Sequence, residues 1–422
     1  MRVLPLLPAA PLVLLGVIGV KAMPSPALQA AGADPPAAID TDTAHLTNGF
    51  LASLGRTIFR FDTFGDEQLW TGFLRMQEPI ATLSPRQALG VGLKVDLDAL
   101  PPAVVAALKA GQVNLDDPAV TLLLLRANAV VGVKGRVNAA GTLTSVGITC
   151  ALCHSSVDDA LAPGIGHRLD GWANTTLNVG AIVALSPALD PNLKAEFSTW
   201  GPGKYDPRHH YFDGTKLVSL NTPSLPIVIP PIYGLQRVGF ETVSADGPIS
   251  YWNAYVGIGQ MGGHGSFRDP RIGVRIVQQP DLVTPKLLPL LIYQLTLFKP
   301  SPPAGSFDAA AALRGREVFH GAAGCARCHQ GPAFTDVLSG PLRNWPVLHD
   351  PDEVGTEAEY ASRTATKRYR TTPLRGLFQR ALYFHDGSAA TLEAVVDHYV
   401  AQFGLKLSGA QKADLVQYLK SI

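Results

Sequence analysis

Charged residues are scarce in this sequence, and neither sign is in clear excess. Asp, Glu, Lys and Arg make up 16% of the 422 residues, and the formal net charge is +1. Proteins that bind nucleic acid through its phosphates carry a strong basic excess, so we expect no nucleic-acid partner. Beyond the N-terminal segment, long apolar runs are missing as well. The apolar stretch Leu287–Leu297 is too short to span a bilayer and contains Gln294.

The N-terminal segment is the one long apolar run. It follows Arg2, is interrupted by three prolines and ends at Lys21. A short basic start, an apolar centre and small residues beyond it are typical of a secretory signal peptide. We therefore predict a signal peptide and leader over residues 1–33, cleaved after Ala30 or Ala33, and a periplasmic protein. An uncleaved membrane anchor is the alternative, which the prolines disfavour.

Cysteine is rare, and its four copies all lie in two C-x-x-C-H patterns. This pattern is the attachment signature of haem c. The two thiols form thioether bonds with the haem vinyl groups, and the histidine is the proximal ligand of the iron. Two disulfides or one zinc site would not explain the histidine after each pair, and zinc binding or redox cysteine pairs are the alternatives to haem. The sequence thus predicts two covalently bound haem c groups and no structural disulfide, with the binding residues Cys150, Cys153, His154, Cys325, Cys328 and His329.

The two motifs are too far apart in the sequence for one small haem domain. We predict a mainly α fold with two cytochrome-c-like haem domains, long loops and a helical N-terminal addition. The N-terminal haem domain is expected over 45–300 and the C-terminal cytochrome c domain over 304–422. The proline-rich stretch Lys299–Pro303 between them is typical of a linker.

Apolar periodicity and cap residues predict the main elements. Helices are expected over 102–110, 120–125, 287–297 and 307–319, with a strand over 130–137. Ser306 is the predicted cap of the helix over 307–319. Thr391 caps a further predicted helix, and Ser408 with Gln411 forms a capping box at the last one.

Two stretches of the C-terminal domain resemble the bacterial di-haem cytochrome c peroxidase family, which includes the MauG-type enzymes. They are Tyr369-Arg-Thr-Thr-Pro-Leu-Arg-Gly-Leu377 and Tyr383-Phe-His-Asp-Gly-Ser-Ala-Ala-Thr-Leu392. The resemblance implies that the C-terminal haem transfers electrons and that the N-terminal haem reduces hydrogen peroxide. It also implies a small redox protein as electron donor, either a cytochrome c or a cupredoxin, and a homodimer as one option.

Methionine is scarce too, and none of the four copies follows the second motif. In the peroxidases, a methionine on the helix after the F-H-D-G stretch ligates the electron-transfer haem. The matching position here is Tyr399, and the MauG branch of the family carries a tyrosine there. The resemblance thus implies that Tyr399 is the sixth ligand of the His329 haem, with His385 and His398 as alternatives.

The sixth position of the first haem has several candidates. His167 lies shortly after the motif, and Met261 and His264 lie in a glycine-rich stretch. An open iron position suited to catalysis is the alternative to any of these ligands. A general acid for cleavage of the O–O bond is then needed nearby, and the candidates are Asp170 and Glu241.

The family resemblance implies further site residues. The family places a tryptophan between its haems, and the equivalents here are Trp172 and Trp200. It also binds calcium at the domain junction, for which Thr371 and Pro373 match. Arg375 is predicted to pair with a haem propionate, because a guanidinium suits a carboxylate; a surface salt bridge is the alternative.

The sequence as a whole predicts a periplasmic di-haem oxidoreductase that reduces hydrogen peroxide. The resemblance extends to MauG-like oxidation of another molecule, which is the main enzymatic alternative. The extra length and loops also resemble larger di-haem relatives such as the rubber oxygenases, which makes oxygenation of a hydrophobic polymer a more distant alternative. A pure electron-transfer cytochrome with two six-coordinate haems is the alternative from a different class.

Overall fold

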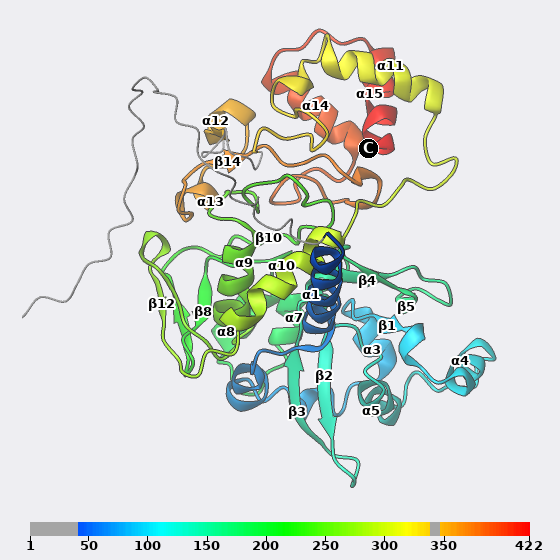
Figure 1. Ribbon diagram of the computed structural model, residues 1–422, viewed down its shortest axis with the longest axis vertical. Helices are drawn as coiled ribbons and strands as arrows, with labels where there is room; N and C mark the ends of the chain where they lie inside the picture. Colours follow the sequence, from blue (N-terminus) through cyan, green and yellow to red (C-terminus); the bar gives the residue numbers. More distant parts are fainter. Residues whose placement is uncertain (1–40, 338–346) are drawn as a thin grey trace, which may run out of the picture. The chain divides into compact units, whose positions relative to one another are not determined.

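The computed structural model describes residues 41–337 and 347–422, with side chains from residue 48 onward. The predicted signal peptide and leader lie outside the described residues. Residues Leu46–Ile422 form one compact unit, drawn in Figure 1. Across the described ranges, no helix combines the length and the apolar character needed to cross a bilayer.

The fold is mainly helical, as predicted. Two π-helical segments, η1 (Gln68–Phe73) and η3 (Val256–Gln260), accompany the α-helices. The described α-helices are α1 (Thr41–Phe61), α2 (Gln77–Ile80), α3 (Pro85–Gly90), α4 (Pro102–Lys109), α5 (Pro118–Arg126), α6 (Ala151–His154), α7 (Val179–Val183), α8 (Pro191–Ser198), α9 (Ile249–Tyr255), α10 (Leu287–Thr296), α11 (Ala309–His320), α12 (Pro351–Val354), α13 (Glu359–Ser362), α14 (Leu392–Gln402) and α15 (Gly409–Ser421).

Strands are short and, within the described ranges, pair only in twos. One pair is parallel, namely β1 (Val95–Asp96) with β5 (Ile165–Gly166). The antiparallel pairs are β2 (Val133–Val137) with β3 (Leu143–Ile148), β4 (Ser155–Val157) with β6 (Arg168–Asp170), β7 (Lys204–Tyr205) with β10 (Ile227–Val228), β8 (His210–Phe212) with β9 (Leu217–Ser219), β11 (Phe267–Asp269) with β12 (Val274–Ile276), and β13 (Leu348–His349) with β14 (Tyr369–Arg370).

The larger hydrophobic core draws its buried side chains from residues 58–293. Helix α5 packs against strand β2, whose antiparallel partner β3 leads directly into the first C-x-x-C-H motif. The predicted helices over 102–110, 120–125 and 287–297 are confirmed as α4, α5 and α10. The predicted strand over 130–137 is β2, which begins at Val133.

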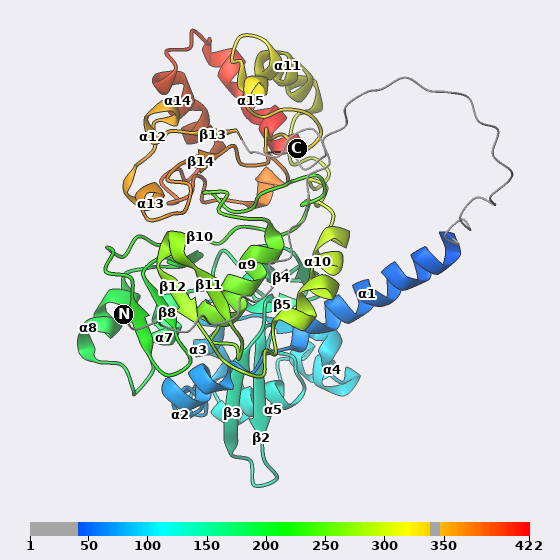
Figure 2. The same ribbon diagram turned by 60° about the vertical axis from the view of Figure 1, so that its left-hand side comes forward.

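A smaller core holds α11, α14 and α15 together, as Figures 1 and 2 show. It buries Phe319 of α11, Leu392 and Val396 of α14, and Leu415 and Leu419 of α15, and Cys325 packs against it. Burial of several large apolar side chains is the main contribution to such a core, at roughly 1.5–3 kcal/mol per fully buried side chain. Three helices thereby form a frame around the second motif.

One segment, residues 230–241, contacts residues that follow the second motif. The Tyr233 hydroxyl donates to the Gly376 carbonyl at 3.2 Å. The Gly239 amide donates to the Val337 carbonyl at 3.1 Å, and Arg370 donates to the Phe240 carbonyl at 2.7 Å. The predicted linker at 299–303 lies in an irregular stretch that is largely exposed.

Candidate haem-binding sites

The first motif is a tight turn at the end of β3. Strand β3 ends at Ile148, and the one-turn helix α6 carries Cys153 and His154. The loop before β2 approaches so closely that a Cβ at Gly132, whose φ is +76°, would lie 2.1 Å from the Leu152 backbone nitrogen. Only glycine fits there. The two thiols and the imidazole are therefore held on one short, well-packed turn.

His154 is oriented as a metal ligand. Its Nδ1 lies 3.0 Å from the Pro230 carbonyl oxygen, which accepts from the ring when the proton is on Nδ1. Burial lowers the pKa of His154 to about 4, so the ring is neutral near pH 7. A histidine ligand commonly donates its other ring N–H to a carbonyl in this way. Nε2 is the atom left for iron.

The second motif repeats this arrangement on a 3₁₀ turn, η6 (Cys325–Arg327). Gly324 precedes the turn with φ +64°, a value that favours glycine. The His329 Nδ1 lies 3.1 Å from the Phe334 carbonyl oxygen, and burial lowers the pKa of this imidazole too. Both motif histidines are thus neutral, fixed by a carbonyl, and open at Nε2.

The four cysteines fit covalent haem attachment. None of them forms a disulfide. Burial raises the pKa of the Cys150 and Cys153 thiols to about 12 and that of Cys325 to about 11. Thiols of this kind are not reactive thiolates, which argues against the redox-pair alternative. Two sulfurs and one open imidazole nitrogen in each motif match the donor set that haem c requires.

Tyr399 on α14 lies near the second motif. Burial, with the nearby Cys325 and Cys328 sulfurs, raises the pKa of its hydroxyl to about 12. The ring stacks on Phe403, with centroids 5.9 Å apart and planes 7° apart, and meets Phe384 edge-on. No hydrogen bond engages its hydroxyl among the residues that the structure describes. The Tyr399 hydroxyl therefore lies near the motif and has no hydrogen-bond partner among the described residues.

The two histidine alternatives at the second haem have other partners. The His398 Nε2 lies 2.9 Å from the Val354 carbonyl oxygen. The His385 Nε2 lies 2.7 Å from Glu357 Oε1, and its Nδ1 lies 3.4 Å from the Thr356 hydroxyl. Both ring nitrogens of His385 therefore face protein groups, and ligation would break these contacts.

The candidates for the sixth position of the first haem have different surroundings. His167 is at the surface, where its Nδ1 pairs with Asp98 at 2.8 Å and its side chain is 55% exposed. The His264 Nδ1 lies 2.8 Å from the Pro280 carbonyl oxygen, so its Nε2 is the atom open to a ligand. Met261 is buried, and its carbonyl accepts from the Trp70 indole at 3.0 Å.

The two candidate acids differ in their surroundings. Asp170 pairs with Arg60 at 2.6 Å and accepts hydrogen bonds from the hydroxyls of Tyr293 and Ser155. Glu241 is buried 3.5 Å from Arg370 Nη1, and burial raises its pKa to about 7 although Arg370 lowers it. Glu241 can therefore exchange a proton near neutral pH, whereas Asp170 is a fixed partner of Arg60.

The two tryptophans also occupy different environments. Trp172 follows Gly171, whose amide donates to the His154 carbonyl at 2.8 Å. Its ring meets Tyr233 and Phe378 edge-on, at centroid distances of 6.5 and 6.4 Å. It therefore bridges residues next to the first motif and residues after the second. Trp200 is buried in the larger core, and its indole donates to Ser224 at 2.8 Å.

Arg375 and Thr371 are engaged with backbone and side-chain groups of the protein. The Arg375 guanidinium donates to the Gly234 carbonyl and, at 3.2 Å, to the Pro332 carbonyl. The Thr371 carbonyl accepts from the Thr335 hydroxyl at 2.6 Å. A calcium ion would have to replace the Thr335 hydroxyl at that oxygen or share the oxygen with it. Arg375 links the 230–241 segment to the loop after His329.

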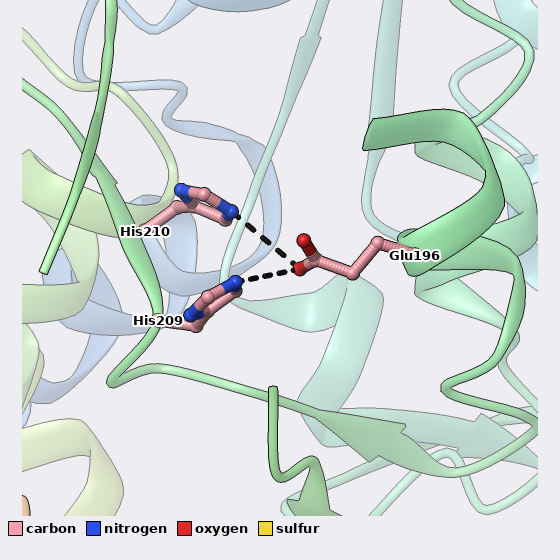
Figure 3. A group of neighbouring side chains, drawn as sticks. All are labelled: Glu196, His209 and His210. Carbon is pink, nitrogen blue, oxygen red and sulfur yellow. Dashed lines mark ion pairs between the residues drawn. The ribbon is translucent and has the colours of Figure 1, made fainter. Parts of the chain in front are cut away.

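One cluster of polar residues escaped the sequence analysis. Glu196, His209 and His210 point toward one another, as Figure 3 shows. The adjacent histidines were the available signal. Glu196 gave none, because its place in the cluster depends on how α8 packs against the loop before β8.

No known family model matches the chain, but several curated proteins match part of it. The methylamine utilization protein MauG of Methylorubrum extorquens is 32% identical over 124 residues, which cover 26% of this chain and 34% of that protein. The cytochrome-c peroxidase IdrP2 of Denitromonas iodatirespirans is 29% identical over 140 residues, covering 26% and 38%. The matched region spans little more than a third of these relatives.

Among solved structures, a MauG-like protein associated with microbial copper homeostasis aligns with 46% of this chain and 72% of its own. The TM-score is 0.35, and the sequences are 17% identical.

Proposed function

We propose that the chain belongs to the bacterial di-haem cytochrome c peroxidase and MauG family, whose members match a quarter of its length, and that it is a periplasmic enzyme that reduces hydrogen peroxide. The observation that carries this proposal is the repeated geometry of the two C-x-x-C-H motifs. In each, a half-buried neutral histidine is tied through Nδ1 to a backbone carbonyl. Haem c bound at these motifs supplies one-electron redox chemistry and a site for peroxide.

The two sites have different tasks in this proposal. Residues Ala151 and Leu152 of the first motif are buried, whereas Arg327 of the second is exposed together with the adjacent Gly321 and Ala322. A buried site excludes bulk water from the reaction, and a site near the surface suits electron exchange with a docked protein. We therefore assign peroxide reduction to the His154 site and electron entry to the His329 site.

Residues of this chain complete the assignment. Tyr399 is the proposed sixth ligand beside His329, because its hydroxyl is near the motif and uncommitted. Trp172 is the proposed electron bridge, because its ring contacts residues adjoining both motifs. Glu241 is the proposed proton-exchanging group, because its pKa lies near 7. The electron donor is a small redox protein, a cytochrome c or a cupredoxin.

A second candidate function is MauG-like oxidation of another molecule. Tyr399 favours it, since it stands where the peroxidases carry a methionine. An oxygen ligand in place of a thioether lowers the reduction potential of a haem. The two functions differ in the final electron source, which is a redox protein in the first and an organic or protein substrate in the second.

The test uses the purified holoprotein with both haems attached. Its ferric absorption spectrum is recorded, and peroxide consumption is followed with a reduced cytochrome c or cupredoxin as donor. We expect high-spin character at one haem and donor-dependent peroxide consumption. Two low-spin haems with no peroxide consumption, before or after prior reduction, would contradict the enzyme and support a pure electron-transfer cytochrome.

A further inference from the structure

Three potential metal ligands meet outside both haem motifs. Glu196 lies on α8, His210 begins β8, and His209 precedes it. Figure 3 shows the two imidazole rings facing the carboxylate from the opposite side. One nitrogen of each histidine and one oxygen of Glu196 all lie within 4.8 Å of one another. None of the three residues has a role in the proposed peroxide chemistry.

Glu196 approaches both histidines closely without forming a hydrogen bond to either of them. Glu196 Oε1 lies 2.9 Å from His209 Nε2 and 3.5 Å from His210 Nε2. Neither contact has hydrogen-bond geometry, since Glu196 Oε1 and His210 Nε2 are buried without a hydrogen-bond partner among the residues that the structure describes. A tetrahedral ion with bonds of roughly 2.0–2.1 Å holds its ligand atoms about 3.3–3.4 Å apart. The two distances from the carboxylate oxygen to the imidazole nitrogens, 2.9 and 3.5 Å, lie within about half an ångström of that separation.

The backbone around the cluster is well fixed. Asp190 caps α8 by accepting from the Asn192 and Leu193 amides at 2.9 and 3.1 Å. The His209 carbonyl accepts from the Leu220 amide at 2.9 Å, and the His210 carbonyl accepts from Gln260 at 3.2 Å. Ligands carried on fixed elements lose little freedom when an ion binds. The cluster is thus pre-arranged.

We propose that Glu196, His209 and His210 bind one divalent transition-metal ion of the zinc type. Two imidazoles and one carboxylate are a common three-ligand set for zinc, with a fourth position left for water. Imidazole also selects against calcium and magnesium, which prefer oxygen ligands. The side chains of His209 and His210 are 11% and 13% exposed and that of Glu196 is 27% exposed, so solvent reaches the cluster along the carboxylate.

A plain structural ion pair is the competing interpretation. An ion pair would need one histidine, protonated and aligned with the carboxylate. Here two rings approach the same oxygen, their centroids are 4.0 Å apart, and the His210 Nε2 remains buried without a hydrogen-bond partner. Protonating both rings would bring two positive charges together. One cation bound between Glu196 Oε1, His209 Nε2 and His210 Nε2 would give all three atoms a partner.

The test is zinc binding to the chelator-treated holoprotein, measured by calorimetry and by elemental analysis after dialysis. We expect one zinc per chain in addition to haem iron, and zinc should raise the melting temperature. The variants Glu196→Gln and His210→Ala should each weaken zinc binding at least tenfold. The matched control is His320→Ala, which removes an exposed histidine at the end of α11 and should leave zinc binding unchanged.

Each outcome decides the proposal. No zinc bound by the wild type, or equal binding by wild type and Glu196→Gln, would overturn it in favour of a structural pair. Far-ultraviolet circular dichroism and the haem absorption spectrum report whether a variant is folded. Because Glu196→Gln keeps the shape of the side chain, it separates lost ligation from lost structure. The result does not depend on whether the haems reduce peroxide.

Discussion

Tyr399 is the proposed sixth ligand of the second haem, and a single substitution tests that role. Phenylalanine at this position keeps the ring stacked on Phe403 but removes the only oxygen that can ligate. We expect Tyr399→Phe to change the low-spin absorption and electron paramagnetic resonance signals of the second haem. Tyr399→Met should raise its reduction potential, on the order of 100 mV within the ~0.8 V that axial ligands span.

The matched control for Tyr399 is Tyr418→Phe. Tyr418 is a buried tyrosine of the smaller core and packs edge-on against Phe319. Its loss of a hydroxyl should leave both haem spectra unchanged. Identical spectra for Tyr399→Phe and wild type would rule out Tyr399 as a ligand. His398 and His385 would then be the candidates for the sixth position.

Glu241 gives a prediction about pH. Its pKa is raised from 4.5 to about 7 in the folded protein, so the folded state binds this proton more tightly than the unfolded chain. Its stabilising contribution is complete below about pH 4.5 and is lost as the pH rises through about 7. We expect Glu241→Gln to remove this part of the pH dependence, on the order of 1–3 kcal/mol between pH 5 and 8.

The measurement for Glu241 is urea unfolding of wild type and variant at both pH values, followed by the haem absorption. The free energy of unfolding of the wild type should fall more steeply with pH than that of the variant. Equal slopes would mean that Arg370 keeps Glu241 ionised throughout. Glu241 would then be unsuitable as a proton donor near pH 7.

The residues of the site were predictable only where the signal is local. The C-x-x-C-H motifs compress three haem-binding groups into five positions, so the sequence alone indicates them. The group that fixes each histidine is a backbone carbonyl, at Pro230 and at Phe334, and any residue type supplies one. Glu196 likewise reaches His209 only through the packing of α8, and no sequence pattern encodes that approach.

Elements were predicted well where apolar periodicity and caps agree. The cap at Thr391 is confirmed, because its hydroxyl accepts from the Ala394 amide at 3.2 Å, and the capping box at Ser408 is present. The predicted cap at Ser306 is wrong. Its hydroxyl donates to the Pro303 carbonyl at 2.7 Å, and Asp308 caps α11 by accepting from the Ala311 amide. A serine in a proline-rich turn finds a local carbonyl first.

The contact between α11 and α15 leads to a prediction about stability. A Cβ at Gly315 would lie 2.0 Å from the Asp414 carbonyl oxygen and 2.9 Å from the Tyr418 Cβ. Backbone cannot yield as a flexible side chain can, so the helices would have to separate. We expect Gly315→Ala to lower the free energy of unfolding by about 1–3 kcal/mol or more, measured by guanidinium unfolding of the holoprotein.

Gly409 supplies the control for Gly315. It begins α15 and has nothing within 4 Å of an added Cβ. Alanine there removes backbone freedom from the unfolded chain without a clash. Gly409→Ala should therefore leave stability unchanged or raise it slightly. Equal stability of the two alanine variants would show that the helices adjust freely at their crossing.

Across the whole molecule, loops without regular secondary structure make many of the contacts between residues that are far apart in the sequence. Residues 200–248 hold little regular structure beyond the short strands β7 to β10. The 230–241 segment runs from the carbonyl that fixes His154 to the one that Arg370 binds. These two contacts join residues 76 and 130 positions apart in the sequence, and local patterns do not encode them.

Trp172 connects this long-range packing to function. Its ring lies between Tyr233, near the His154 site, and Phe378, in the segment that follows the His329 motif. Phenylalanine would keep an apolar ring there but remove the larger indole, widening the gap that an electron must cross. We expect Trp172→Phe to slow electron transfer between the haems at least tenfold, measured by stopped-flow absorption after pre-reduced protein meets peroxide.

Trp200→Phe is the matched control, because Trp200 packs against Phe197 and Tyr205 within the larger core and has no partner after the second motif among the described residues. It should lose the hydrogen bond to Ser224 and some stability, yet transfer electrons at the wild-type rate. If both variants transfer at that rate, the electrons bypass Trp172, and the backbone of the 230–241 segment becomes the next path to test. If Trp200→Phe alone is slow, the electron bridge has been assigned to the wrong tryptophan.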